Sequence, residues 1–368
     1  MLKFLLKLSK NKSTNVKRIV TMKNFNAILP HVSIIILNWN NWKDTIECLE
    51  SIYQINYPYY NVVLVDNNST DGSIEKIKEY CEGALKVEST FFENGKVKKP
   101  IKIMENIHED LCWGFSTNPK GYNRDLILIK NSENLGFAEG NNVGIHYALE
   151  HLKSDYLMLL NNDTVVDTDF LNELILFSEK NNEIGISGPS VFYYDDPHTL
   201  TYIGGHVDVC HGKITYPYLN ETIKSETPEE MDYISGCSLL IKRDVIKDIG
   251  LLDPDYFLYY EDTDWCLRAK NAGYNLFYVP KARIWHKVSA SMENSSTSFY
   301  YGTRNQFLLM KKNCKKGIKF LFIKFLAGRL ISIISYLIKR DTKKASLSYK
   351  ILVDVIKGDY GYKKLKIK

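Results

Sequence analysis

Short apolar runs alternate with amphipathic segments along the first half of the chain. Residues 32–37, 61–65, 126–129 and 156–160 are aliphatic runs typical of strands that are buried on both faces. Between them, residues 44–53, 73–81 and 141–152 carry apolar side chains at helical spacing. Strand and helix in alternation predict right-handed βαβ units within an α/β sheet.

The rest of the pattern predicts further elements and three segments. Residues 185–187, 233–241 and 274–279 indicate additional strands, and 233–241 is expected to cross the core as a single strand. Residues 83–125 are irregular and are interpreted as an insertion between core elements. The expected organisation is therefore a basic leader over 1–30, an α/β domain over 31–313, and a basic and apolar helical segment over 314–368.

Composition narrows the class of protein. The 368 residues are 45% hydrophobic and 25% charged, which is ordinary for a globular chain with one large domain and an appendage. A net charge of +5 is modest at this length and does not indicate a nucleic-acid partner. Seven scattered cysteines without a CxxC pair favour a reduced, cytosolic setting. Lys3 and Lys7 interrupt the first apolar residues, so no secretion signal is expected.

Polar side chains follow the first two predicted strands. Asn38 and Asn40 follow the first strand, and Asp66 and Asn68 follow the second. Ligands of α/β sheets bind beyond the carboxyl ends of the strands, where Asp66 can accept hydrogen bonds from a base or ribose. Turn and helix N-cap chemistry is the alternative, since Asn, Ser and Asp perform it routinely.

A glycine-containing turn precedes the helix expected at 141–152. Gly136 and Gly140 would let backbone N–H groups approach an anion or a ribose. The turn has neither the GK[ST] ending of a Walker loop nor the GxGxxG pattern, so a plain turn is equally compatible.

Acidic residues gather at two later positions. Asp163 ends the Asn-Asn-Asp sequence after an apolar strand and can hold a hard divalent cation, or cap the helix expected near Asp169. Glu261, Asp262 and Asp264 lie within four residues, which favours a general base near a metal ion or, alternatively, a solvated helix N-terminus.

One histidine follows the second acidic position at the end of a predicted strand. His286 lies directly after the apolar residues of this segment. Imidazole is a common ligand of transition metals, although a lone histidine of this kind can also be purely structural.

In this order, these residues and Ser235-Gly236 resemble the inverting glycosyltransferase family 2, in particular its rhamnosyltransferase-like branch, over about residues 31–313. The resemblance implies the GT-A fold, in which a nucleotide-binding α/β half is continuous with an acceptor-binding half. It also implies contacts to a nucleotide-diphosphate sugar from Leu37, Asn38, Asn40, Asp66, Asn68, Asn134, Gly136, Asn141, Asn161, Asn162 and Arg304.

The same resemblance implies a chemistry. Asp163 corresponds to the last acid of the family's DXD motif and would bind Mg²⁺ or Mn²⁺ together with His286, although Asn161 departs from the strict motif. Asp262 would be the base, with Glu261 as its rival, and would take the acceptor's proton in a single inverting displacement.

The C-terminal segment carries basic residues within an apolar sequence. These residues are Lys315, Lys316, Lys319, Lys324, Arg329, Lys339 and Arg340. The pattern suits the headgroup zone of an anionic membrane, here through residues 314–340, and a packed appendage or a dimer interface competes with it. The uncharged run 330–338 is too short to cross a bilayer alone. Membrane contact would suit a lipid-linked acceptor and a cytoplasmic enzyme held at the inner face of the membrane.

Two other functions remain open. A nucleotidyltransferase or pyrophosphorylase would need a glycine-rich phosphate loop near the first strand, and residues 38–41 contain no glycine. A non-catalytic sugar-binding protein is favoured by Asn161, since a fold does not fix activity. The sequence does not indicate the acceptor, the linkage or the oligomeric state, and the resemblance suggests dTDP-rhamnose or a UDP-sugar as donor.

Overall fold

The computed structural model describes residues 29–93, 95–107, 124–223, 225–288, 295–314, 317–363 and 365. It divides into two compact units, Met1–Pro30 and His31–Lys368, and the description below concerns the second. Most of the predicted leader, and residues 108–123 of the predicted insertion, lie outside the described residues.

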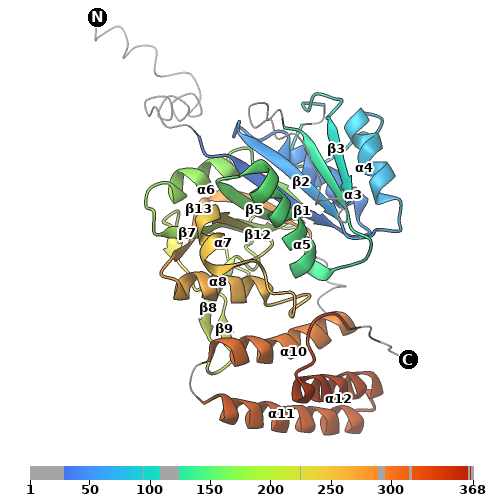
Figure 1. The fold of residues 1–368 in the computed structure, drawn as a ribbon, viewed down its shortest axis with the longest axis vertical. Helices are drawn as coiled ribbons and strands as arrows, with labels where there is room; N and C mark the ends of the chain where they lie inside the picture. The colour runs from blue at the N-terminus through green and yellow to red at the C-terminus, as the bar shows by residue number, and fades with distance from the viewer. Residues whose placement is uncertain are drawn as a thin grey trace, which may run out of the picture. The chain divides into compact units, whose positions relative to one another are not determined.

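A mixed sheet forms the centre of the protein (Figure 1). Among the described residues its strands are β1 (Val32–Asn38), β2 (Tyr60–Asp66), β3 (Ile103–Ile107), β4 (Leu126–Lys130), β5 (Tyr156–Asn161), β6 (Thr164–Val166), β7 (Ile184–Tyr193), β10 (Glu229–Glu230), β12 (Ser238–Lys242) and β13 (Asn275–His286). Their order is β10-β13-β7-β12-β5-β1-β2-β4-β3, with β6 paired to β13. The aliphatic runs of β1 and β2 are buried, which confirms the predicted α/β sheet.

Helices cover both faces of this sheet. They are α3 (Trp42–Ile52), α4 (Ser73–Glu82), α5 (Gly136–Tyr147) with a π-helical turn η2 (Ala148–Leu152), α6 (Phe170–Ser178), α7 (Arg243–Ile249) and α8 (Glu261–Asn271). The β1-α3-β2 and β4-α5-β5 crossovers run in opposite directions along the sheet, so right-handed connections place α3 and α5 on opposite faces. Gly144 lets α5 approach closely, because a Cβ there would lie 2.6 Å from Ile35.

One edge of the sheet collects the predicted polar residues. β1, β2 and β5 are parallel, β12 is antiparallel to β5 and to β7, and β13 is parallel to β7. The carboxyl ends of β1, β2, β5 and β13 therefore meet the start of β12 at the same edge. Asn38, Asp66, Asn161 and His286 are the last residues of those four strands.

Two sequence-based expectations differ from the structure. Residues 233–241 form two strands, because β11 (Tyr233–Ile234) pairs with β8 (Gly204–Asp208) in a small second sheet that also contains β9 (Lys213–Thr215). Residues 235–237 turn between β11 and β12, where the Ser238 N–H donates to the Ser235 carbonyl at 3.2 Å. The segment interpreted as an insertion contributes β3, which pairs in parallel with β4 at the edge of the main sheet.

Three helices follow β13 among the described residues, and the last two of them lie in the segment 314–368 that was predicted to be helical. They are α10 (Ser296–Asn313), α11 (Ile318–Ile338) and α12 (Thr342–Lys357). Tyr300, Phe307 and Ile351 lie in the buried cluster between them, and Phe257 packs against this cluster from the loop before α8. α10 therefore connects the helical appendage to the α/β core.

Candidate active site

Side-chain hydrogen bonds fix the ends of β1 and β2 at the polar edge. The Asn38 amide donates to Asp66 Oδ1 at 2.8 Å, and its Oδ1 accepts from Thr45 Oγ1 at 2.9 Å. Asp66 Oδ2 accepts from the Ser69 N–H at 2.9 Å, which is turn chemistry of the kind considered as an alternative. Helix α4 has Gly72 as its N-cap, so Asp66 is not a helix cap.

The two loops beyond these strands form an exposed polar rim. Asn40 and Asn68 are exposed and have φ values of 53° and 60°. Asn40 Oδ1 accepts from the Thr70 N–H at 2.7 Å, which ties the loops together. Trp39 lies beside them with 54% of its surface exposed and was not singled out from the sequence. An exposed indole next to amide groups suits a nucleoside.

The glycine turn before α5 is already occupied by protein groups. Gly136 has φ +79°, and a Cβ there would lie 2.3 Å from the ring of Phe257. The Phe257 carbonyl accepts from the N–H groups of Phe137 and Ala138 at 2.7 and 3.3 Å, and Asn134 Oδ1 accepts from the Gly136 N–H at 2.8 Å. These amides therefore do not fit the predicted approach to an anion, and the plain-turn interpretation describes them better.

Two more residues that were predicted to contact the nucleotide-sugar donor, Asn141 and Leu37, pack against other parts of the protein in this structure. The Asn141 side chain is buried and donates to the Phe137 carbonyl of its own helix at 2.8 Å. Leu37 packs against α5 where Gly140 leaves room, since a Cβ at Gly140 would lie 2.8 Å from Leu37 Cδ1.

Asp163 lies in the tight connection from β5 to β6 and faces the end of β13. Its Oδ1 is 3.0 Å from His286 Nε2, and its carbonyl accepts from the Lys287 N–H at 2.9 Å. Strand β6 separates Asp163 from α6, so the helix-cap alternative does not apply. Burial opposes ionisation of Asp163, but the neighbouring His286 outweighs it and holds the pKa of this carboxyl below its ordinary value.

These two side chains fit a divalent cation. Asp163 Oδ1 and His286 Nε2 lie 3.0 Å apart as an ion pair, so they are close enough to hold one cation together once the imidazole has lost its proton. A mixed oxygen and imidazole set favours Mn²⁺ over Mg²⁺. In the described part of the chain, no group of three or more His, Cys, Asp or Glu side chains surrounds a common point. Water and substrate phosphates would supply the remaining ligands.

Asp262 lies in the first turn of α8 and is partly exposed. Its Oδ2 accepts from the Gly236 N–H at 2.8 Å, and its Oδ1 accepts from the Thr263 N–H at 2.6 Å and the Thr263 hydroxyl at 3.1 Å. Burial raises the pKa of Asp262 although these hydrogen bonds oppose it. A partly exposed carboxylate with a raised pKa suits a general base.

Glu261 has a different environment. It is only 4% exposed, and its Oε2 is buried without a hydrogen-bond partner among the described residues. Burial, and then the charge of Asp262, raise the pKa of Glu261 well above its ordinary value. The buried position argues against the alternative of a solvated helix N-terminus and makes Asp262 the accessible member of the pair.

The turn at residues 235–237 joins the two acidic positions. Gly236 donates to Asp262, while the Cys237 carbonyl accepts from the Asn161 N–H at 2.9 Å. The Cys237 thiol also contacts the ring of His286. Asp262 and the Asp163–His286 pair therefore lie on either side of a three-residue turn at one edge of the sheet.

Arg304 does not lie at this edge. It is fully buried and donates to the carbonyls of Gly361, Asp255 and Tyr256 at 2.7, 3.0 and 3.2 Å. Because backbone oxygens already accept from these N–H groups, the buried Arg304 does not fit the predicted phosphate contact and has a structural role in the core.

Two residues outside the predicted set of site residues, Thr45 and Asn67, hold the polar edge in place from beneath. Thr45 on α3 accepts from the Asn162 amide at 2.9 Å while it donates to Asn38. The Asn67 amide donates to Asn134 Oδ1 and to the Gly136 carbonyl, both at 3.0 Å. A polar residue next to the predicted Asp66 was the available signal for Asn67, whereas nothing marked Thr45 among the other polar residues of its helix.

The strand order and the polar carboxyl edge define a GT-A fold. The chain belongs to the family described as glycosyltransferase like family 2, whose family model matches residues 30–305. This confirms the resemblance drawn from the motifs. The mannosyltransferase PcManGT from Pyrobaculum calidifontis, solved with GDP-Man and Mn²⁺, has the same fold, with a TM-score of 0.51 and 14% identity over 93% of this chain and 94% of that one.

Bacterial rhamnosyltransferases are among the relatives. The dTDP-rhamnosyl transferase RfbF of Shigella flexneri is 26% identical over 50% of this chain and 63% of its own length. The rhamnosyltransferase WbbL of Escherichia coli is 27% identical over 41% of this chain and 60% of its own length. The matches thus span less than two thirds of each relative, and they support the rhamnosyltransferase-like branch.

Proposed function

We propose that this protein is an inverting glycosyltransferase that moves a sugar from a nucleotide-diphosphate donor to a hydroxyl of a glycan or lipid-linked acceptor, in the synthesis of cell-surface polysaccharide or glycoconjugate. The observation that carries the proposal is the pair of unlike carboxylates, Asp163 and Asp262, on either side of the turn at 235–237. One is held ionised by His286 and the other has a raised pKa.

The donor side comprises the ends of β1, β2 and β5. The exposed Asn40 and Asn68 would contact the base and ribose, while the buried Asp66 and Asn38, which bond to each other, would hold these loops in place from beneath. Asn161 and Asn162 would lie beside the diphosphate. Asp163 and His286 would hold Mn²⁺ or Mg²⁺, which supplies positive charge beside the leaving phosphate when bound.

Asp262 performs the proton transfer. It accepts the proton of the acceptor hydroxyl while that oxygen forms a bond to the anomeric carbon and the bond from that carbon to the phosphate oxygen breaks on the opposite face. The nucleoside diphosphate leaves with the bonding electrons, and the anomeric configuration inverts. The Gly236 N–H donates to Asp262 Oδ2, and this hydrogen bond keeps the carboxylate oriented toward the edge of the sheet.

Donor protection and donor turnover together test the proposal. The purified protein is mixed with Mn²⁺ and, in turn, dTDP-rhamnose, UDP-glucose, UDP-galactose or GDP-mannose, and both the melting temperature and the release of nucleoside diphosphate are measured. Stabilisation and release with one donor support the enzyme, and dTDP-rhamnose is the expected donor. Stabilisation without release, even with added glycan acceptors, would favour a non-catalytic sugar-binding protein, and pyrophosphate-dependent release of a nucleoside triphosphate would favour a pyrophosphorylase.

We further propose that α11 rests on an anionic membrane surface at the cytoplasmic face. Among the described residues, α11 is the one helix long and apolar enough to span a membrane, with only 6% of its most apolar stretch buried. This amends the expectation drawn from residues 330–338 alone. Leu321, Phe322 and Phe325 pack inward, however, so the helix has one covered and one open face.

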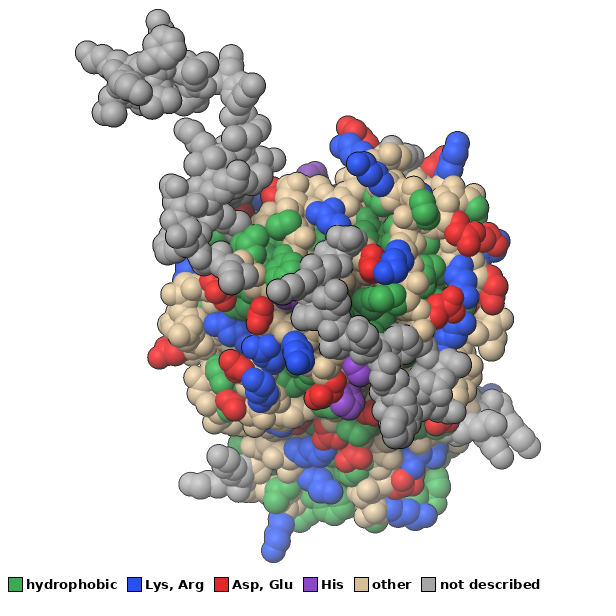
Figure 2. Space-filling model, turned by 45° about the horizontal axis from the view of Figure 1, so that its top comes forward, with side chains coloured by type: hydrophobic (Ala, Val, Ile, Leu, Met, Phe, Trp, Pro, Cys, Tyr) green, Lys and Arg blue, Asp and Glu red, His purple; other side chains and the backbone are tan. Residues whose placement is uncertain are grey.

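The open face of α11 is apolar and has basic neighbours. Its exposed apolar residues are Phe320, Ile323, Leu330, Ile331, Ile334, Leu337 and Ile338. Lys319, Lys324 and Lys339 lie on or beside the same helix, and each basic residue near an anionic surface contributes about 1 kcal/mol. Figure 2 shows charges of both signs over the core and apolar side chains beside basic ones at the lower end of the molecule. A helix of this kind lies in the interface plane.

Vesicle sedimentation tests the membrane proposal. We expect the protein to sediment with vesicles of phosphatidylcholine and phosphatidylglycerol, and the variant Ile331→Glu/Ile334→Glu to remain in the supernatant. Leu176→Glu, which changes an exposed apolar residue of α6, is the matched control and should still sediment. Failure of the unchanged protein to bind would contradict the proposal, and a dimer that the double substitution dissociates would indicate an interface between copies.

A further inference from the structure

We propose that Arg304 and Asn305 of α10 are positioning residues, which hold the segment 253–260 in a strained conformation and so place Asp262 at the acceptor. The inference deepens the proposed function and rests on it. Both side chains are fully buried, and neither contacts Asp163 or Asp262 through any recorded hydrogen bond among the described residues.

The segment before α8 has an unusual backbone. Phe257, Tyr259 and Tyr260 have φ values of +62°, +70° and +74°, a region that bulky L-residues rarely adopt. A hydrogen bond of 2.7 Å from the Leu258 N–H to the Tyr256 carbonyl closes a γ-turn around Phe257, of the form with positive φ that is rare and strained. Such conformations persist only where the surrounding structure over-determines them.

The side chain of Asn305 holds the strained segment in this conformation. Its Nδ2 lies 2.8, 2.8 and 2.9 Å from the carbonyl oxygens of Tyr256, Leu258 and Tyr259. The two N–H bonds of this amide therefore serve three carbonyls that point inward only because the backbone has positive φ on either side. A residue without these donors would remove one hydrogen bond from each of the three carbonyls, and the Tyr256 carbonyl would keep those from Arg304 Nη2 and the Leu258 N–H.

Arg304 orients the amide and extends the contact. Its Nε donates to Asn305 Oδ1 at 2.9 Å, which turns the Asn305 NH₂ group toward the loop. Its Nη2 donates to the carbonyls of Asp255 and Tyr256, and its Nη1 donates to Gly361 near the C-terminus. The guanidinium thus joins the loop, α10 and the C-terminal residues at one buried point.

The held segment leads directly to both sides of the active site. Tyr260 is the N-cap of α8, and its carbonyl accepts from the Asp264 N–H at 2.9 Å, so its conformation sets where α8 and Asp262 begin. The Phe257 carbonyl caps the first turn of α5 on the donor side. A shift of this loop would therefore move Asp262 relative to the donor edge.

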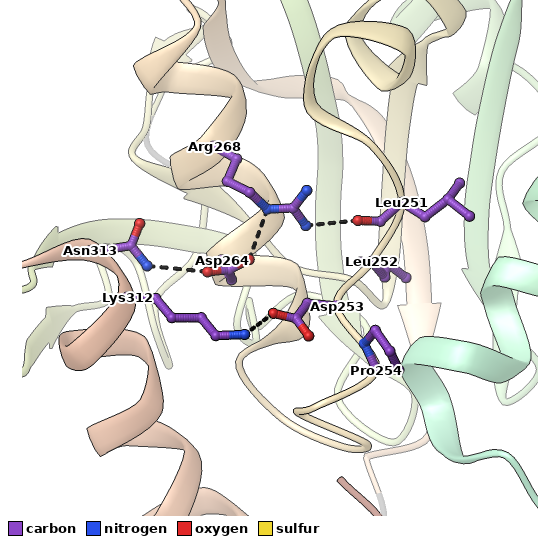
Figure 3. A pocket seen from close by; sticks show the side chains of 8 residues that line it. All are labelled: Leu251, Leu252, Asp253, Pro254, Asp264, Arg268, Lys312 and Asn313. Carbon is purple, nitrogen blue, oxygen red and sulfur yellow. Dashed lines mark hydrogen bonds and ion pairs between the residues drawn. The ribbon is translucent and has the colours of Figure 1, made fainter. Parts of the chain in front are cut away.

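The end of α10 holds the same segment a second time (Figure 3). Asn313 Nδ2 donates to Asp264 Oδ1 at 3.1 Å, and Lys312 pairs with Asp253 and, at 3.4 Å, with Asp255. Asn313, Lys312, Asp253 and Asp264 line a cavity of about 400 Å³, in which Arg268 pairs with Asp264 at 2.9 Å. Because these charged groups are paired with one another, we interpret the cavity as the seam between α10 and the loop.

Kinetics of two variants and one control test the positioning role. The assay uses the full chain, Mn²⁺ and the donor that the unchanged protein turns over. The variants are Asn305→Leu and Arg304→Lys, and the control is Gln306→Ala. The Gln306 side chain lies on the same helix but donates to the Gly212 carbonyl at 2.9 Å. Asn305→Leu should lower kcat about 100-fold, the scale of a misplaced catalytic group, while the donor KM changes less than about threefold. Arg304→Lys should lose less, and Gln306→Ala should change neither constant.

Hydrogen exchange tests the contact between Asn305 and the loop before α8 independently of catalysis. Asn305→Leu should speed amide exchange in residues 255–263 and leave β1 and β5 unchanged. A kcat within about threefold of the unchanged protein, or equal losses in kcat for all three variants, would overturn the inference. If no donor is turned over by the unchanged protein, the proposed function fails, while unaltered exchange in Asn305→Leu would independently refute the hold on the loop.

Discussion

Asp163 and Asp262 reach the same edge of the sheet by opposite structural means. Asp163 lies between β5 and β6, of which β6 pairs with β13, and the Lys287 N–H directly after β13 donates to the Asp163 carbonyl. Asp262 follows an irregular segment with three aromatic residues at positive φ, which side chains of α10 hold in place. Regular pairing therefore positions one carboxylate, and a strained loop positions the other.

Their electrostatic environments also diverge. His286 holds the pKa of Asp163 below the ordinary carboxyl value, whereas burial raises the pKa of Asp262. Environments that push two carboxyl pKa values apart indicate a division of roles between them. A carboxylate that stays ionised suits a cation, and one that gains a proton more readily suits the base. The comparison teaches that neighbouring acids in one site are distinguished by their partners rather than by residue type.

Removal of the proposed base, Asp262, should have the largest effect. Asp262→Asn should lower kcat about 10³-fold, within the usual contribution of general base catalysis, because the amide cannot accept the proton. The affinity for donor with Mn²⁺ should change little, since Asp262 lies across the turn at 235–237 from Asp163. Steady-state kinetics and donor titration measure both quantities, and full activity would assign the base to another group.

Removal of the cation ligand should weaken donor binding instead. Asp163→Ala should lower the affinity for the nucleoside diphosphate in Mn²⁺ by about tenfold or more, which is at least about 1.4 kcal/mol, and EDTA should have no further effect on this variant. Calorimetric titration with and without EDTA measures it. Asp169→Asn, at the N-cap of α6, is the matched control. Equal affinities for Asp163→Ala and the unchanged protein would show that Asp163 holds no ion.

The contrast between Asp163 and Asp262 also shows which parts of the structure could be predicted from the sequence. The aliphatic runs and the polar residues at their ends predicted the sheet, its carboxyl edge and Asp163, because parallel strands bring distant ends together by regular geometry. The loop before α8 was not predictable, since three aromatic residues carry no sign of positive φ. Arg304 was misread for the same reason, because its partners are backbone carbonyls that only the folded loop presents.

The edge strand β3 and the turn at 235–237 were missed for a related reason. The sequence of β3, Ile103–Ile107, is short and has two polar residues, Glu105 and Asn106, at its centre, so it did not stand out from an insertion. Residues 233–241 were expected to form one strand, but the chain turns at 235–237, where the Gly236 N–H donates to Asp262, which is 26 residues away. Long-range contacts of this kind leave no local pattern.

The neighbour of the base should tolerate substitution far better than the base. Burial and the charge of Asp262 raise the pKa of Glu261 well above its ordinary value, so Glu261→Gln keeps the shape of the side chain and the charge of its protonated form. We expect kcat within about fivefold of the unchanged protein, a small fraction of a general-base effect. Activity should still fall as the pH drops through the raised pKa of Asp262. A pH profile of kcat measures this, and a loss as large as that of Asp262→Asn would make Glu261 the base.

Glu261→Gln should also change how the stability of the folded protein depends on pH, because it replaces a buried acid with a neutral amide. In the unfolded chain Glu261 ionises near its ordinary pKa, whereas in the folded protein burial keeps it protonated, so the folded state binds more protons. Stability from this group is therefore fully present below the ordinary pKa and declines as the pH rises toward the folded value. Glu261→Gln removes the decline, so its melting temperature should exceed that of the unchanged protein by about 2 °C or more at pH 7.5. The difference should vanish near pH 4, and an equal difference at both pH values would show that Glu261 is ionised in the folded protein.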